Sequence, residues 1–318
     1  MSVFKRMLSA FGVGGPSVDT VLDSTAVCPG EVLRGRVSIQ GGANDVVIDA
    51  VVLSLVTRVE VEHGGGEHGG VGEFHRLVVQ RAVRVTANQR LDIPFQLAIP
   101  WETPVTMVGD VHLPGVTVGV RTELEIKGAP DKGDLDPVAV RPLPSQNQVL
   151  EAFGELGATF RTADVEAGRI VGVPQEIGFY QEIEFFPPPQ FAGRLNQVEL
   201  TFVANPRDLW VVLEADKRGG LFRPGGDTFG RFQLPHAEAE EADWTSLIGE
   251  WLTRAAERVP HGNPAFGGHH GNRQHHGNRG PGMGAIVGGA AAGLVGGMII
   301  GDMMDGELFD GGGEDSEE

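Results

Sequence analysis

The sequence from Leu91 to Thr106 reads LDIPFQLAIPWETPVT. Its apolar residues fall at every second position, which is the period of a β-strand with one buried face: Leu91, Ile93, Phe95, Leu97 and Ile99. Pro94 has no backbone N–H to give to a ladder, so we expect this strand at a sheet edge or at a bulge. Pro100 ends the strand. Neighbouring segments share the alternation, so the strand is expected to complete a sheet.

Segments before and after this stretch predict further strands. Val47–Val61 is the longest, and Leu77–Val85 returns beside it after a flexible hairpin loop, HGGGEHGGVGE, at His63–Glu73. Val118–Ile126 alternates in the same way. Short strands joined by turn residues, without alternating helices, are typical of an antiparallel β-sandwich.

The second half contains more strands and two helical segments. Val149–Leu156 places its apolar residues on one helical face, and Asp243–Arg258 is the clearest helix. Its apolar stripe contains Trp244, Leu247, Ile248 and Trp251. Such a stripe either packs into the core of its own domain or docks in a partner's groove, and we keep it as a candidate partner-docking face.

These segments predict an all-β fold with two tandem sandwiches, a C-terminal amphipathic helix and a disordered Gly/His-rich tail. The expected boundaries are a first sandwich at 1–127, a linker at 128–136, a second sandwich with the helix at 137–259, and the tail at 260–318. The linker reads GAPDKGDLD and is rich in turn residues.

Six segments in order resemble one known family: FKRMLSAFGVG, PGEVLRGRVSIQGG, IDAVVLSLVTRVEVEH, PFQLAIPWETPVT, VGVRTELEIKGAPDKGDLDPVAV and VLEAFGELG. The chain is similar to the bacterial sporulation-control proteins (stage-zero protein M) of the arrestin-like superfamily. The resemblance covers about the first half of the chain and extends more weakly towards Val259. It implies two arrestin-like sandwiches and a regulatory, non-enzymatic role as an adaptor or scaffold in sporulation or development.

Composition limits the partners. The formal charge is -18, and no stripe of Lys and Arg is present, which argues against nucleic-acid binding. The partners expected are other proteins. The single cysteine, Cys28, excludes an intramolecular disulfide and fits a cytoplasmic protein, with Cys28 as a buried or turn thiol.

No catalytic, cofactor or metal site is predicted. The sequence has no phosphate-binding Gly-rich loop, no G-x-S-x-G elbow and no HExxH or CxxC motif. His63, Glu67, His68 and His75 lie near one another on the predicted loop, which does not preorganise a metal site. Asp131, Asp134 and Asp136 lack EF-hand spacing and are interpreted as linker.

The tail leaves three interpretations open. GAIVGGAAAGLVGGMIIG, at Gly284–Gly301, has glycine at every fourth position: Gly289, Gly293, Gly297 and Gly301. On a helix this face permits close backbone approach, as in self-association, whereas simple membrane insertion and a disordered tail are the alternatives. A membrane-associated structural protein that oligomerises through this tail is therefore the second functional hypothesis, with the basic N-terminal segment Ser2–Phe11 as a further candidate for peripheral membrane contact.

One double variant separates these interpretations. Gly293→Leu with Gly297→Leu raises hydrophobicity and helix propensity but pushes helices apart. Sedimentation and membrane partition are measured together: self-association predicts lower oligomer mass with retained partition, and simple insertion predicts unchanged mass with stronger partition. No change in either quantity contradicts both and leaves the disordered tail.

Overall fold

The computed structural model describes residues 15–63, 66–127, 132–217 and 227–257. Within this part the chain forms two compact units, unit 1 up to Leu143 and unit 2 from Pro144. The basic N-terminal segment Ser2–Phe11 and the Gly/His-rich tail, with its glycine face Gly289, Gly293, Gly297 and Gly301, lie outside the described residues. No helix of the described residues is both long and apolar enough to cross a membrane.

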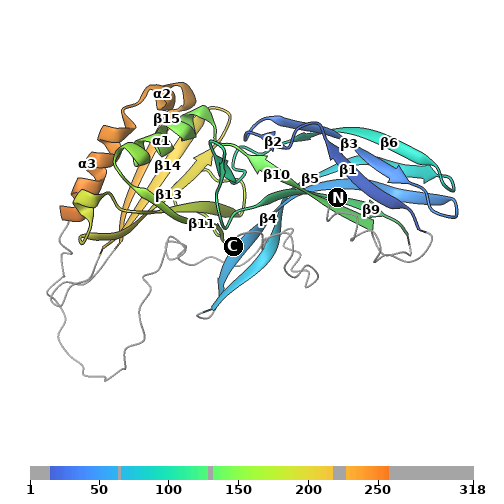
Figure 1. The fold of residues 1–318 in the computed structure, drawn as a ribbon, viewed down its shortest axis with the longest axis horizontal. Helices are drawn as coiled ribbons and strands as arrows, with labels where there is room; N and C mark the ends of the chain where they lie inside the picture. The colour runs from blue at the N-terminus through green and yellow to red at the C-terminus, as the bar shows by residue number, and fades with distance from the viewer. Residues whose placement is uncertain (1–14, 64–65, 128–131, 218–226, 258–318) are drawn as a thin grey trace, which may run out of the picture. The chain divides into compact units, whose positions relative to one another are not determined.

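Unit 1 is built from two sheets that face each other. One sheet has the order β1-β3-β6, and the other has the order β5-β4-β9-β10-β2 (Figure 1). The strands are β1 (Ser17–Leu22), β2 (Ala26–Val27), β3 (Val32–Gln40), β4 (Val46–His63), β5 (Gly66–Val85), β6 (Arg90–Ala98), β9 (Val118–Glu125) and β10 (Lys132–Val140), with a small hairpin of β7 (Met107–Val108) and β8 (Val111–His112). All named pairings are antiparallel except that of β10 with β2.

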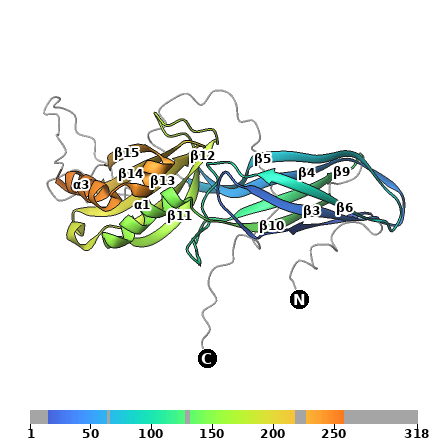
Figure 2. The same cartoon turned by 90° about the horizontal axis from the view of Figure 1, so that it is seen from above.

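The alternation that predicted β6 is confirmed. Ile93, Phe95, Leu97 and Ile99 are buried, while the residues between them are exposed. These side chains join a core cluster that includes residues of β3, β4 and β9 from the two facing sheets, seen from above in Figure 2. Among the described strands β6 pairs only with β3, so Pro94 lies on an edge strand, as its missing N–H requires.

The core around Phe95 is closely fitted. Gly35 lies opposite Phe95 in the β3–β6 register. A Cβ on Gly35 would lie 2.8 Å from Phe95 Cζ and 2.5 Å from the Val21 carbonyl oxygen. Because no side chain fits there, the ring of Phe95 occupies the space that Gly35 leaves.

Two predicted connections of unit 1 differ from the structure. Strand β5 begins at Gly66 and pairs with β4 up to the Gly66–His63 position, so most of the predicted loop His63–Glu73 belongs to a ladder. Glycine backbones donate and accept ladder bonds without a side-chain face, which is why the residue pattern did not show this strand. The backbone thus continues the hairpin through a glycine-rich sequence.

The predicted linker at 128–136 is also placed differently. Strand β10 begins at Lys132 and pairs with β9, and the division between the units follows Leu143. The physical reason is the burial of Val138 and Val140 in the core of unit 1, and of Leu135 on the other face of β10. The turn-forming residues at the start of β10 therefore belong to a paired strand, although they carry no apolar alternation.

Unit 2 is one antiparallel sheet covered on one face by helices. The sheet has the order β15-β14-β13-β12-β11, and Figure 1 shows the helices gathered along it. Its elements are α1 (Pro144–Glu155), β11 (Thr159–Ala167), β12 (Phe179–Phe186), the 3-10 helix η2 (Pro189–Phe191), β13 (Leu195–Ala204), β14 (Asp208–Lys217), β15 (Asp227–Pro235), α2 (His236–Glu241) and α3 (Trp244–Glu257). The mostly-β prediction is confirmed, but in the described part of unit 2 helices supply the second layer that a second sheet was expected to form.

Aromatic contacts fix the helical layer on the sheet. The rings of Phe153 in α1 and Phe185 in β12 lie 4.5 Å apart, and those of Phe232 in β15 and Trp244 in α3 lie 5.8 Å apart edge to face. A Cβ on Gly230 of β15 would meet the indole of Trp251, so glycine makes room for that ring. The helices are thus held by interlocked side chains of large apolar area.

The predicted partner-docking face on α3 is wrong. Trp244, Ile248 and Trp251 are buried in unit 2, and Leu247 is half-buried. The stripe covers the sheet of its own unit, and core packing was the correct alternative. The helix begins as predicted, because Asp243 Oδ1 accepts a hydrogen bond from the Ser246 N–H at 2.9 Å.

Truncating Phe95 tests the core of unit 1. Phe95→Ala is expected to lower the free energy of unfolding by about 3–5 kcal/mol, because the ring loses its burial and leaves a cavity beside Gly35. Denaturant melts measure the loss. Gln96→Ala, at the neighbouring exposed position, is the control and should change stability by less than about 0.5 kcal/mol. Equal losses in the two variants would contradict this account of the buried face.

Candidate functional site

The face of the unit 2 sheet opposite the helices carries a row of acidic side chains. Asp164 and Glu166 lie on β11, Glu182 on β12, Glu199 on β13 and Glu214 on β14. They occupy the alternate positions to those that contact the helices, since neighbouring residues of a strand point to opposite faces. Asp164 lies directly opposite Glu182, and Glu199 directly opposite Glu214.

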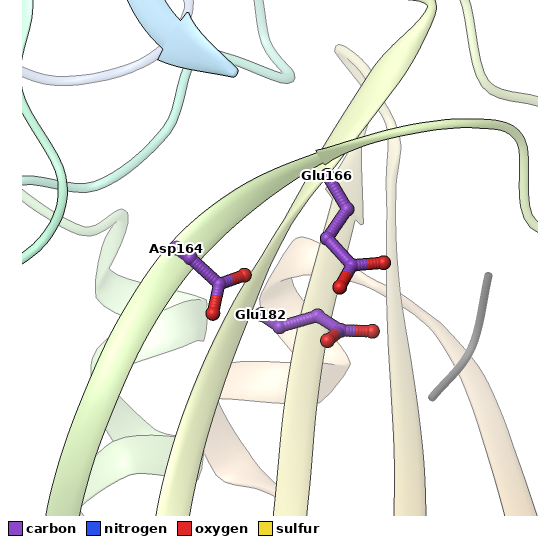
Figure 3. A group of neighbouring side chains, drawn as sticks. All are labelled: Asp164, Glu166 and Glu182. Atoms are coloured by element: carbon purple, nitrogen blue, oxygen red, sulfur yellow. The ribbon is translucent and has the colours of Figure 1, made fainter. Parts of the chain in front are cut away.

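Three of these carboxylates converge at one point. One oxygen each of Asp164, Glu166 and Glu182 lies within 4.8 Å of the other two, and Figure 3 shows the three groups turned toward a common space. We refer to these three residues as the carboxylate cluster. Two neighbouring strands of a rigid sheet therefore fix three oxygen donors side by side.

An apolar patch lies beside the cluster on the same face. Tyr180, Val203, Trp210 and Val212 pack there against Ile170 of the β11–β12 connection. The Tyr180 hydroxyl donates a hydrogen bond to Glu166 Oε2 at 3.3 Å. The cluster is thus bounded by packed side chains, and one of them orients a carboxylate.

Gln175 fixes the connection that covers this patch. Its Oε1 accepts a hydrogen bond from the Ile170 N–H at 3.0 Å, and its Nε2 donates to the carbonyl oxygens of Ile177 and Phe179 at 2.8 Å. Since Gln175 is buried, these bonds replace those that water would make. The positions of Glu166 and Tyr180 at the ends of β11 and β12 follow from this closure.

Glu182 is the most constrained member of the cluster. It is 3% exposed, and its Oε1 is buried without a hydrogen-bond partner among the described residues. Burial first, and then the charges of Glu199, Glu166, Asp164 and Glu214, raise the pKa of Glu182 well above its usual range. Among the described residues each charge that shifts this pKa is a carboxylate, so these neighbours oppose the ionised form of Glu182.

The sequence profile described as SpoOM protein matches residues 4–219. This chain belongs to that family.

One relative and its crystal structure show how far the similarity extends. The sporulation-control protein Spo0M of Bacillus subtilis (strain 168) is 32% identical over 266 residues, which is 81% of this chain and 100% of the relative. The crystal structure of Bacillus subtilis Spo0M superposes with a TM-score of 0.67 at 28% identity, covering 76% of this chain and 100% of that chain. The resemblance seen in the sequence is therefore confirmed at the level of family and fold.

The carboxylate cluster was missed by sequence reasoning. Glu182 and Glu184 alternate with the apolar Ile183 and Phe185, as polar residues on a strand commonly do, and no pattern places acids of different strands together. One signal was present: β14 reads LWVVLEA from Leu209 to Ala215, and an acidic residue inside an apolar central strand has to be buried. Glu214 is indeed 2% exposed.

A second acidic group lies in unit 1. Asp134 Oδ2 accepts a hydrogen bond from the Thr20 N–H at 2.8 Å, and Asp136 is half-buried on the same strand. Burial, then the charge of Asp134 and a hydrogen bond with it, then the charge of Asp19, raise the pKa of Asp136 to about 7. These aspartates were interpreted as linker residues, whereas Asp134 joins β10 to β1.

The other residues considered from the sequence do not form a site. His75 is half-buried on β5, and burial lowers its pKa. The side chains of His63, Glu67 and His68 lie outside the described residues. Cys28 is half-buried before a turn, and burial and then the charge of Glu31 raise the pKa of its thiol, which opposes a reactive thiolate.

The raised pKa of Asp136 predicts a pH-dependent stability. A carboxyl group whose pKa is raised on folding stabilises the fold fully below its unfolded pKa of 3.8, and the contribution is lost as the pH rises through about 7. The melting temperature of unit 1 should therefore fall between about pH 4 and pH 7. Asp136→Asn should flatten this slope, and Asp110→Asn, at an exposed position, should not. An unchanged slope in Asp136→Asn would contradict the assignment.

Proposed function

We propose that this chain is a non-enzymatic regulator of sporulation that acts as an adaptor or scaffold by binding other proteins. The observation that carries the proposal is that the similarity to Bacillus subtilis Spo0M spans the whole length of that relative, including both units. The name of that relative describes a control role rather than a catalytic one. The single cysteine fits action in the cytoplasm.

The outer edge of unit 2 supports a role in binding. Strand β15 pairs only with β14 among the described strands, so the backbone groups along its other edge are open to an added strand. Phe229 on this strand is 42% exposed, and Arg231 and Gln233 are exposed as well. Strand addition draws its affinity from backbone hydrogen bonds and its specificity from alternate side chains. We take β15 as the docking edge of the proposed adaptor.

The edge formed by β6 in unit 1 is less suited to such a partner. Strand β6 ends the first sheet of unit 1, but Pro94 removes a backbone donor from its middle. Exposed Asp92 adds a charge on the same strand. This edge therefore has the features by which natural sheets resist further pairing.

Complementation tests the proposal. Expression of this chain in Bacillus subtilis lacking spo0M is expected to restore wild-type spore counts, with the native gene as the positive control. Gln233→Lys should reduce restoration, because a lysine on an edge strand opposes strand addition. Thr253→Lys adds the same charge at an exposed position of α3 and is the matched control.

The outcomes separate the two parts of the proposal. A folded chain at native abundance that leaves spore counts at the level of the deletion strain would contradict the sporulation role. Equal restoration by Gln233→Lys and Thr253→Lys would retain that role and contradict docking along β15. Circular dichroism of both variants confirms that each remains folded.

A further inference from the structure

We propose that the carboxylate cluster of Asp164, Glu166 and Glu182 binds one hard divalent cation of the Ca²⁺ type. This site is independent of the proposed regulatory role and of the docking edge. It was not expected from the sequence, from which no metal site was predicted.

The geometry of the three oxygens fits a single ion. Oxygen ligands lie about 2.3–2.6 Å from Ca²⁺, so two ligands of one ion are separated by at most about 5 Å. One oxygen from each of the three residues lies within 4.8 Å of the other two. The three groups come from the adjacent strands β11 and β12, and Figure 3 shows them directed to the same space.

Glu182 supplies the second, independent indication of a ligand. Its side chain is 3% exposed and points into the cluster, and its Oε1 has no hydrogen-bond partner among the described residues. A buried polar atom without a partner is costly, and such atoms in native proteins commonly mark an ion or a water. A cation between the three groups would satisfy this oxygen.

The contacts of the described arginines of unit 2 lie outside the cluster. The described arginine side chains of unit 2 contact other groups: Arg161 pairs with Glu184, Arg207 with Asp208, and Arg254 with Glu250, while Arg169, Arg194 and Arg231 donate to backbone carbonyl oxygens. None of these contacts reaches the cluster. Asp164 and Glu182 are moreover direct cross-strand neighbours, an arrangement that like charges destabilise. A divalent ion bound between the groups would offset this repulsion.

The donor set selects the class of ion. Carboxylate oxygens suit Ca²⁺, Mg²⁺ and Mn²⁺, whereas softer ions prefer nitrogen or sulfur. Ca²⁺ accepts irregular shells of carboxylates, but Mg²⁺ demands near-octahedral geometry and keeps several waters. Because the cluster is fixed on two strands and buried at Glu182, we expect Ca²⁺ to bind more tightly than Mg²⁺.

Calorimetric titration of the full chain with Ca²⁺, and separately with Mg²⁺, tests the site. The wild type, Glu182→Gln and a matched control, Glu184→Gln, are compared. Glu184 lies on the same strand and the same face but pairs with Arg161 outside the cluster. All three proteins carry the same His-rich and acidic tail, so any binding there is common to them.

The wild type and Glu184→Gln are expected to bind one more Ca²⁺ per chain than Glu182→Gln. Saturating Ca²⁺ should raise the melting temperature of these two proteins by several degrees, because the ion binds the folded state. Glu182→Gln should gain nothing from Ca²⁺, while its melting temperature in chelator should equal or exceed that of the wild type, since a buried carboxyl is neutralised without change of shape.

Two results would overturn the proposal. Equal Ca²⁺ stoichiometry in the wild type and Glu182→Gln would place the ion elsewhere, and the absence of a Ca²⁺-dependent rise in the wild-type melting temperature would exclude a buried site. Asp164→Asn provides a second variant if Glu182→Gln does not fold, and it should lose the same ion.

Discussion

Unit 2 depends on a sheet that buries apolar side chains on one face and carboxyl groups on the other. Alternation places apolar residues such as Phe185 and Leu200 on one face, and α1 and α3 cover them with Phe153, Trp244 and Trp251. The same alternation places Glu182, Glu199 and Glu214 on the opposite face, where each is almost fully buried. Buried carboxyl groups are costly unless they are protonated, hydrogen-bonded or bound to a cation. The unit therefore combines a conventional apolar layer with a face whose charge has to be compensated.

Unit 1 also buries a large apolar core, but it buries no comparable row of carboxyl groups among the described residues. Its two sheets bury Phe95, Val37 and Leu53 between them, and polar residues occupy the outer positions of β3 and β6. Asp136 is the partial exception, since it is half-buried beside Asp134 and its pKa lies near neutrality. Unit 1 is thus a sandwich stabilised mainly by apolar burial, and unit 2 contains the chemically unusual face.

Much of the fold was predictable because it follows from local periodicity. The alternation of β6 gave its buried face, Pro94 gave its edge position, and Asp243 gave the start of α3. The glycine-rich start of β5 and the beginning of β10 were missed, because glycine and turn residues carry little periodic signal while their backbones still pair. The helical second layer of unit 2 was missed because the sequence shows that a helix is amphipathic but not which surface it covers.

The carboxylate cluster depends on strand register, which a single sequence does not determine. Asp164 and Glu182 are eighteen positions apart and become neighbours only through the β11–β12 pairing. The most direct test of the cation site is an anomalous difference map from crystals of the full chain grown with Ca²⁺. The account predicts one peak about 2.3–2.6 Å from carboxylate oxygens of Asp164, Glu166 and Glu182. A map without a peak there, with ordered Ca²⁺ bound elsewhere on the chain, would contradict it.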